Sequence, residues 1–212
     1  GARDLTNAGI NCIGVPGTID NDIQCSEYTI GYDTAMNTAM EMVDKLRDTS
    51  QSHDRCSVVE VMGRHAGYIA LNCGIACGAT AIFVPEIPVN LDNVIEKMKT
   101  SQKLGKHHFI ILVAEGIGNV GEIAKEIERQ TGVESRATIL GHVQRGGSPS
   151  MADRMLAAQF GNKAVRLLNE GIGNRVVGIH KNEIIDMDII EAVSMKKTFN
   201  YELYETLQMI SM

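Results

Sequence analysis

Several features that mark particular classes of protein are missing from this sequence of 212 residues. Tryptophan is absent, and the five cysteines include no Cys-x-x-Cys pair, so neither a disulfide framework nor a four-ligand zinc site is indicated. The longest strongly apolar run, residues 109–114, is too short to cross a bilayer, and no secretory signal is visible. The net charge of -6 argues against nucleic-acid binding. We expect a cytoplasmic protein with reduced thiols and no membrane or nucleic-acid partner.

Common nucleotide-binding and nucleophile motifs are missing as well. The sequence contains no Walker A loop, no Gly-x-Gly-x-x-Gly and no Gly-x-Ser-x-Gly. Ser148-Pro149-Ser150 lies at a predicted helix start, which is the wrong context for a nucleophile elbow. A Ser/His/Asp hydrolase is therefore disfavoured.

Short apolar runs alternate with amphipathic stretches along the chain. The predicted strands are residues 10–15, 57–62, 81–84, 109–114, 138–143 and 176–179. The predicted helices include residues 36–46, 94–104, 123–131 and 150–168, the last with a capping box of Ser150 and Asp153. This alternation predicts an α/β fold with a mostly parallel sheet. No Pro/Gly/Ser linker is present, so two domains would require more than one crossing of the chain between them.

Two carboxylates follow the first predicted strand closely, at Asp20 and Asp22 in the loop 16–22. Loops at strand ends are where open α/β sheets bind ligands. Carboxylates in such a loop can remove a proton from a hydroxyl group or hold a divalent cation. The alternative is a turn in which Asp and Asn side chains bond to their own backbone.

The next polar strand ends carry an arginine and a glutamate. Gly63-Arg64-His65-Ala66-Gly67 follows the strand 57–62, and its backbone N–H groups and guanidinium suit an anion. Glu115 follows the strand 109–114 and would face the same edge. The alternatives are a glycine-rich turn with a solvent-facing arginine and a solvated loop glutamate.

The segment 136–147 is the densest in polar groups. Alternation along a strand would place Arg136 and His142 on one face, so that both line one edge, with Arg145 at the exit of the strand. Two arginines and a histidine favour a bound phosphate, although a strand with a surface arginine is the alternative. Taken together, the strand ends supply a base, a metal anchor and cations, as phosphoryl transfer requires.

Four motifs in this order resemble those of the bacterial-type ATP-dependent 6-phosphofructokinases, and the resemblance extends over all 212 residues. They are Gly-Val-Pro-Gly-Thr-Ile-Asp-Asn-Asp (14–22), Val-Met-Gly-Arg-His-Ala-Gly (61–67), Val-Ala-Glu-Gly (113–116) and Leu-Gly-His-Val-Gln-Arg-Gly-Gly-Ser-Pro (140–149). The resemblance implies Mg²⁺-dependent transfer of a phosphoryl group from ATP to the 1-hydroxyl of fructose 6-phosphate. The products would be fructose 1,6-bisphosphate and ADP, as in glycolysis.

The resemblance also implies two Rossmann-like three-layer domains with mostly parallel sheets, the first of them incomplete. Residues 1–31 and 145–197 would form the nucleotide-side domain, and residues 32–144 and 198–212 the sugar-phosphate-side domain. In the family the glycine-rich loop for the ATP phosphates lies upstream of the matched segment. We therefore expect this chain to be inactive alone, and we assign it no ATP-binding residue beyond the loop 16–22.

The resemblance implies roles for individual residues. Asp20 would be the catalytic base, Thr18 would contact the transferred group, Asp22 would lie beside Mg²⁺, and Arg64 would stabilise the transition state. The implied contacts with fructose 6-phosphate are Met62, Gly63, Glu115 and Arg136, with His142 and Arg145 on its 6-phosphate. Arg55 would reach into the site of a neighbouring subunit, which implies a homotetramer.

The sequence departs from the family pattern at an effector pocket. Arg47 and Lys106 match basic positions of that pocket, but Thr80 and Leu104 replace an acid and an arginine. We therefore expect no control by the usual effectors, ADP and phosphoenolpyruvate.

The phosphoryl donor is partly indicated by Gly17, which occupies a position where pyrophosphate-dependent relatives carry lysine. Gly17 favours ATP as the donor. The alternatives are a pyrophosphate-dependent enzyme and a non-catalytic, truncated subunit that binds sugar phosphate.

Overall fold

The structure, a computed structural model, describes residues 1–211. These residues form two compact units. Unit 1 comprises residues 1–34 and 148–198, and unit 2 comprises residues 35–147 and the C-terminal segment from Phe199. The chain therefore passes from one unit to the other three times. Among the described helices, none is both long and apolar enough to span a membrane.

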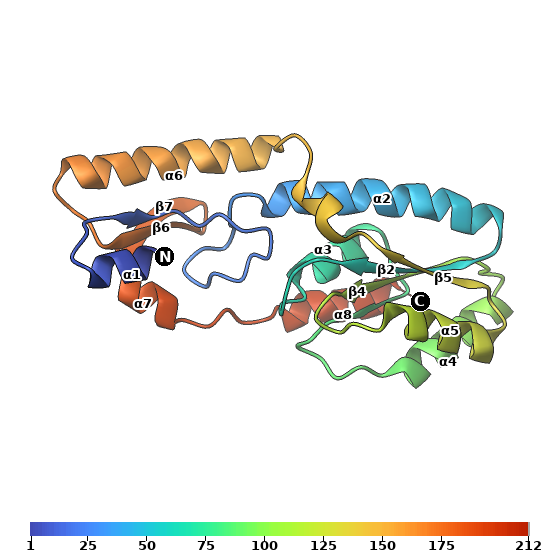
Figure 1. Cartoon of the computed structure of the whole chain (residues 1–212). Helices are drawn as coiled ribbons and strands as arrows, with labels where there is room; N and C mark the ends of the chain where they lie inside the picture. The colour runs from blue at the N-terminus through green and yellow to red at the C-terminus, as the bar shows by residue number, and fades with distance from the viewer. Residues whose placement is uncertain (212) are drawn as a thin grey trace. The chain divides into compact units, whose positions relative to one another are not determined.

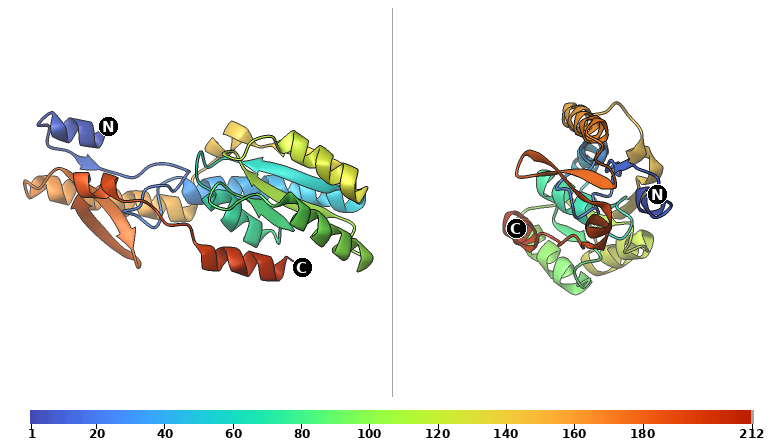
Figure 2. Two further views of the ribbon diagram at one scale, coloured as in Figure 1. Left: turned by 90° about the horizontal axis from the view of Figure 1, so that it is seen from below. Right: turned by 90° about the vertical axis from the view of Figure 1, so that its left-hand side faces the viewer.

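Unit 1 has a three-stranded sheet, with helix α6 (Met151–Asn169) on one face and helix α7 (Ile189–Ser194) on the other (Figures 1 and 2). Its strands are β1 (Ile13–Gly14), β6 (Arg175–His180) and β7 (Glu183–Asp188), in the order β1-β6-β7. Strand β1 is parallel to β6, whereas β6 and β7 form an antiparallel hairpin. The unit also contains helix α1 (Ala2–Asn7).

The core of unit 1 follows from the alternation of side chains along β6. Val177 points to one face and packs with Leu156 and Phe160 of α6. Val176 points to the other face and packs with Ala192 of α7. Because neighbouring residues in a strand face opposite sides, one short strand supports two apolar layers.

Unit 2 has a four-stranded parallel sheet in the order β3-β4-β2-β5. The strands are β2 (Cys56–Val61), β3 (Ala81–Phe83), β4 (Phe109–Ala114) and β5 (Ser135–Ile139). Helices α4 (Leu91–Lys103) and α5 (Val120–Thr131) cover one face. Helices α2 (Tyr32–Ser52), α3 (Tyr68–Ala76) and α8 (Tyr201–Ile210) complete the unit, although the first three residues of α2 belong to unit 1. Helices α2 and α3 lie on the other face (Figure 1). Parallel strands bring all four carboxyl ends to one edge.

The α/β arrangement predicted from the sequence is confirmed, but two strand predictions were wrong. The run 10–15 yields a strand of only two residues, β1. The strand predicted at 138–143 instead spans Ser135–Ile139 and is followed by a 3₁₀ helix, η1 (Gly141–Arg145). Gly141 adopts a φ of +55°, a left-handed conformation that turns the chain out of the sheet.

Two long helices of the chain begin at one buried carboxylate in unit 1. Asp153 is 3% exposed, and its two oxygens accept the N–H groups of Gly31 and Thr34, each at 2.8 Å. The Thr34 hydroxyl donates to the same carboxylate and accepts the N–H of Ser150 at 3.0 Å. Ser150 caps α6 by accepting the N–H of Asp153 at 3.2 Å, as predicted. Asp153 thus satisfies the N-terminus of α2 while lying in the first turn of α6.

We expect Asp153→Ala to lower the free energy of unfolding by about 3 kcal/mol, because partly buried donors at the start of α2 lose a charged acceptor. Urea denaturation followed by circular dichroism measures the change. Asp48→Ala, on the exposed side of α2, is the control and should stay within about 0.5 kcal/mol of the parent. Equal stability of the two variants would contradict this role of Asp153.

Candidate active site

The loop that connects β1 to α2 folds back on itself through polar contacts. Gly17 forms a parallel bridge with Ile30, and the N–H of Asp20 donates to the Thr18 hydroxyl at 3.1 Å. Asn21 has a φ of +50°, and its side-chain amide donates across the loop to the carbonyl of Glu27 at 3.0 Å. Asn21, which lies between Asp20 and Asp22 in the sequence, therefore ties this part of the loop to Glu27.

The two aspartates of this loop differ in their surroundings. Asp20 is only 8% exposed, whereas Asp22 is exposed. Asp22 also lines a cavity of about 600 Å³ in unit 1, together with Gly14, Pro16 and Gly17. A nearly buried carboxylate suits proton transfer, and an exposed one beside a cavity suits a cation.

The residues around Asp22 fit only an open magnesium site. Within residues 1–211, no three His, Cys, Asp or Glu side chains gather closely enough to hold a metal by themselves. Magnesium is commonly bound by one or two carboxylates together with substrate phosphates and water. Asp22 therefore fits a magnesium ion that is shared with a phosphate ligand, and not a closed protein site.

In unit 2, the loop after β2 is fixed from both sides. The backbone N–H of Met62 donates to the side-chain oxygen of Gln144 at 2.7 Å. The N–H groups of Gly63 and Arg64 donate to one oxygen of Glu115, at 3.2 and 2.5 Å. Since β2 lies between β4 and β5, each neighbouring strand end supplies one acceptor.

The loop needs these acceptors because its backbone is unusual. Arg64 has a φ of +58°, a conformation that costs energy for a residue with a Cβ. Gly63 has a φ of +144°, and a Cβ there would lie 2.5 Å from the carbonyl oxygen of Ala66. A Cβ on Gly116 would lie 2.7 Å from the carbonyl oxygen of Arg64. Two glycines and Glu115 thus hold Arg64 with its side chain exposed.

Glu60, in β2, adds a second acidic group near this loop. Burial raises the pKa of Glu60, and the nearby negative charge of Glu115 raises it further. The exposed cations Arg64 and Arg145 follow β2 and β5 at the same edge of the sheet. An anion at this edge would therefore meet the cations Arg64 and Arg145, while the acidic groups Glu60 and Glu115 lie at the strand ends.

Gln144 was not identified from the sequence, yet it anchors η1 to the rest of the site. It is 1% exposed, whereas His142 and Arg145 in the same short helix are exposed. Because the N–H of Met62 donates to Gln144, His142 and Arg145 lie at the edge that carries Arg64 and Glu115. A buried glutamine between exposed residues leaves no periodic signal, so only the folded contacts show its importance.

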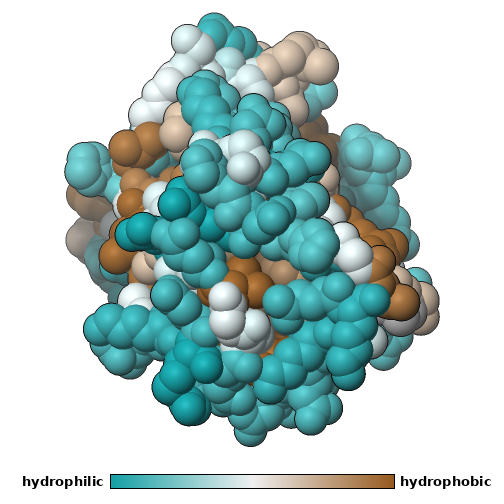
Figure 3. Space-filling view, turned by 90° about the vertical axis from the view of Figure 1, so that its right-hand side faces the viewer, coloured by the Kyte–Doolittle hydropathy of each residue, from teal (hydrophilic) through white to brown (hydrophobic). Residues whose placement is uncertain are grey.

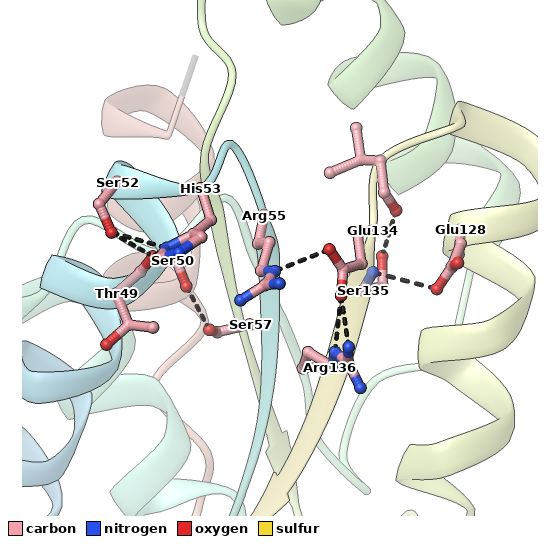
Figure 4. Close-up of polar contacts among 11 residues, drawn as sticks. Thr49, Ser50, Ser52, His53, Arg55, Ser57, Glu128, Glu134, Ser135 and Arg136 are labelled. Carbon is pink, nitrogen blue, oxygen red and sulfur yellow. Dashed lines mark hydrogen bonds and ion pairs between the residues drawn. The ribbon is translucent and has the colours of Figure 1, made fainter.

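Arg136 lies elsewhere, which corrects the expectation that it lines one edge with His142. Arg136 pairs in register with Ser57, near the amino ends of β5 and β2. Strand β5 ends at Ile139, so His142 is not part of it. Arg136 shares the carboxylate of Glu134 with Arg55, through contacts of 2.5 and 2.8 Å (Figure 4). Hydrogen bonds from Arg55 and then Arg136 lower the pKa of Glu134. The surface at this end of unit 2 is mostly hydrophilic (Figure 3).

The residues that resemble an effector pocket surround a cavity of about 180 Å³ in unit 2. Arg47, Thr80, Lys106 and His108 line it, and Arg47 donates to the carbonyl of Cys77. Burial lowers the pKa of Lys106. Leu104 is 84% exposed and does not line the cavity. The cavity therefore has two cations and no carboxylate among these lining residues.

Comparison with known proteins decides the family. The profile of the phosphofructokinase family, described as "Phosphofructokinase", matches residues 1–168. The chain belongs to this family. It is 51% identical over 211 residues to the ATP-dependent 6-phosphofructokinase of Clostridioides difficile (strain 630). It is 53% identical over the same length to that of Clostridium tetani (strain Massachusetts / E88). Both matches cover 100% of this chain and 66% of the relative.

Solved structures support the same assignment. A structure of phosphofructokinase from Saccharomyces cerevisiae superimposes with a TM-score of 0.86 and 33% identity, over 97% of this chain and 34% of that one. A pyrophosphate-dependent phosphofructokinase from Marinobacter aquaeolei gives a TM-score of 0.80 at 23% identity, over 95% and 57% of the two chains. The second likeness establishes the shared Rossmann-like fold and nothing more specific.

We expect Gln144→Met, which keeps the volume but removes the acceptor, to speed hydrogen exchange at the Met62 amide about tenfold, since one such bond is worth about 1.4 kcal/mol. Exchange measured by NMR or mass spectrometry tests this. Val143→Ala, at an exposed position of η1, should leave exchange at Met62 unchanged. Unaltered exchange in Gln144→Met would show that the contact does not anchor η1.

Proposed function

We propose that this chain forms part of an ATP-dependent 6-phosphofructokinase, which transfers a phosphoryl group from ATP to the 1-hydroxyl of fructose 6-phosphate. The observation that carries the proposal is the nearly buried Asp20 beside the exposed Asp22 on one strand-end loop, in a chain of this family. The names of the relatives at 51% and 53% identity support the same reaction. Since the chain spans 66% of their length, the activity is proposed for the complete protein.

In this proposal unit 1 supplies the base. The carboxylate of Asp20 accepts the proton of the 1-hydroxyl as the oxygen of that group attacks the γ-phosphorus of ATP, and ADP leaves with the bridging oxygen. Thr18 contacts the transferred group. Magnesium, when bound beside Asp22, would neutralise part of the charge on the donor phosphates.

Unit 2 supplies the contacts with the sugar phosphate. We propose that His142 and Arg145 bind the 6-phosphate, while Met62, Gly63 and Glu115 line the sugar. The guanidinium of Arg64 neutralises charge that develops on the transferred group. The support for this assignment is that Glu115 and Gln144 hold the loop of Arg64 and η1 at one edge.

Arg55 and Arg136 form a separate pair, and we propose that they act together. The resemblance assigns Arg55 to the sugar-phosphate site of a neighbouring chain. Arg136 binds the same Glu134 carboxylate, so it belongs to the same cluster. A homotetramer in which these arginines serve a neighbouring subunit accounts for their position at the amino ends of β2 and β5, away from Arg64 and Arg145.

The remaining assignments concern the donor, control and location. Gly17 supports ATP over pyrophosphate, and a coupled assay with each donor separates the two enzymes. A subunit that only binds sugar phosphate would show binding of fructose 6-phosphate by calorimetry without turnover. We propose a magnesium-dependent cytoplasmic enzyme. We also propose that it is not controlled by ADP or phosphoenolpyruvate, because Thr80 and Leu104 stand where the family has an acid and an arginine, and leucine cannot bind a phosphate.

In the complete enzyme, we expect Asp20→Ser to lower kcat by about 10²- to 10⁴-fold, because the base is lost, while sugar-phosphate binding is largely kept. Steady-state turnover and calorimetry measure the two effects. Asp48→Ser, at an exposed position on α2, should retain the parent activity. Near-normal turnover of Asp20→Ser would remove Asp20 from the mechanism.

Arg145→Ala should weaken binding of fructose 6-phosphate about tenfold or more, because a charge-assisted bond to phosphate is lost. The KM for fructose 6-phosphate measures this. The control Arg129→Ala changes an exposed arginine of α5 and should not alter the KM. An unchanged KM in Arg145→Ala would contradict the phosphate contact.

A further inference from the structure

Lys197 reaches the loop of Asp20 and Asp22 from a distant part of unit 1. It lies in the segment after α7, near the point where the chain leaves unit 1. Its ammonium group donates to the carbonyl oxygen of Ser26 at 3.0 Å and to that of Glu27 at 3.2 Å. A lysine carries three donors on a long stem, so it can join two carbonyls that a backbone N–H could not reach together.

One of these carbonyls also accepts a bond from the other side of the carboxylate loop. The oxygen of Glu27 also accepts the side-chain amide of Asn21 at 3.0 Å. Asn21 is 5% exposed, has a left-handed backbone and lies directly between Asp20 and Asp22. Lys197 and Asn21 therefore meet at a single carbonyl, and the position of that carbonyl constrains both aspartates.

The surroundings of Lys197 compensate for only part of the cost of burying its charge. Burial lowers the pKa of Lys197 to about 8, while Asp22, Cys25 and Glu27 act in the opposite direction. A partly buried ammonium group is stable only where acceptors and negative charges compensate for lost hydration. Asp22 is one of those charges, so Lys197 contributes to the potential at Asp22 as well as to the shape of the loop.

The loop is also attached to β6, and the Lys197 contact adds to these bonds on a different side. The N–H of Ile179 donates to the Ser26 hydroxyl at 3.1 Å, and the N–H of Glu27 donates to the carbonyl of Ile179 at 2.9 Å. These bonds fix the loop to the sheet at residues 26 and 27. Lys197 binds the carbonyl groups of the same two residues and thereby fixes the side that Asn21 uses.

We propose that Lys197 is a positioning residue that holds the loop 18–30 so that Asp20 and Asp22 keep their places for phosphoryl transfer. The kinetic part of this inference rests on the proposed function, whereas the structural part does not. Lys197 acts through its bonds to the carbonyl groups of Ser26 and Glu27.

The test compares Lys197→Met with Lys197→Arg and with Lys196→Met in the full-length protein. Lys196 is the exposed neighbour, so its variant loses the same kind of charge without the two carbonyl contacts. Hydrogen exchange by mass spectrometry follows peptides within residues 18–30. We expect exchange there to speed at least about tenfold in Lys197→Met only, since a charge-assisted bond is lost.

Kinetics supply the second readout. We expect kcat to fall about tenfold or more in Lys197→Met, while the KM for fructose 6-phosphate stays within about twofold because its proposed phosphate contacts, His142 and Arg145, lie in unit 2. Lys197→Arg should recover most of kcat, and Lys196→Met should match the parent. If Lys197→Met does not fold, Lys197→Gln, which loses the charge but keeps an uncharged NH2 group, is measured against the same criteria.

Equal exchange in Lys197→Met and Lys196→Met would overturn the structural part of the proposal. Faster exchange with an unchanged kcat would overturn positioning for catalysis, as would a loss confined to the KM. If the parent protein itself shows no phosphoryl transfer, the proposed function fails, and the exchange result then still decides whether Lys197 holds the loop.

Discussion

Parallel pairing of β3, β4, β2 and β5 is the constraint on which the candidate site of unit 2 depends. Helices on both faces bury strands β2 and β4, so polar side chains find room where the strands end. The parallel direction brings those ends together, and β2 lies between β4 and β5. The loop of Arg64 can therefore receive an acceptor from each side, Glu115 from one neighbour and Gln144 from the other.

Unit 1 solves a different problem, because its sheet is small and its loop is long. There, charged side chains from distant segments fix the backbone. Asp153 from α6 satisfies the start of α2, and Lys197 from the segment after α7 satisfies carbonyl groups of the loop 18–30. Both charged groups make more than one hydrogen bond, and these bonds offset part of the cost of removing a charge from water. The aspartate loop is held by such contacts as well as by its link to the edge strand β1.

Local sequence was sufficient for features that lie directly after an apolar run. Arg64 and Glu115 were predicted at strand ends because the buried strands before them are short runs rich in apolar residues. Arg136 was placed wrongly, because the alternation was extended through Gly141, where a positive φ ends the sheet geometry. Helix α3 was missed since nearly all of it is buried and it has no polar face. Gln144, Lys197 and the partners of Asp153 act through contacts between distant segments, which periodicity does not encode.

The central claim is that this chain belongs to an enzyme that uses ATP to phosphorylate fructose 6-phosphate. The most direct measurement supplies the complete protein with fructose 6-phosphate, magnesium and either ATP or pyrophosphate, and follows fructose 1,6-bisphosphate with an aldolase-coupled assay. The account predicts product with ATP and little or none with pyrophosphate. Product with pyrophosphate but not with ATP would contradict it, and so would the absence of product with both donors.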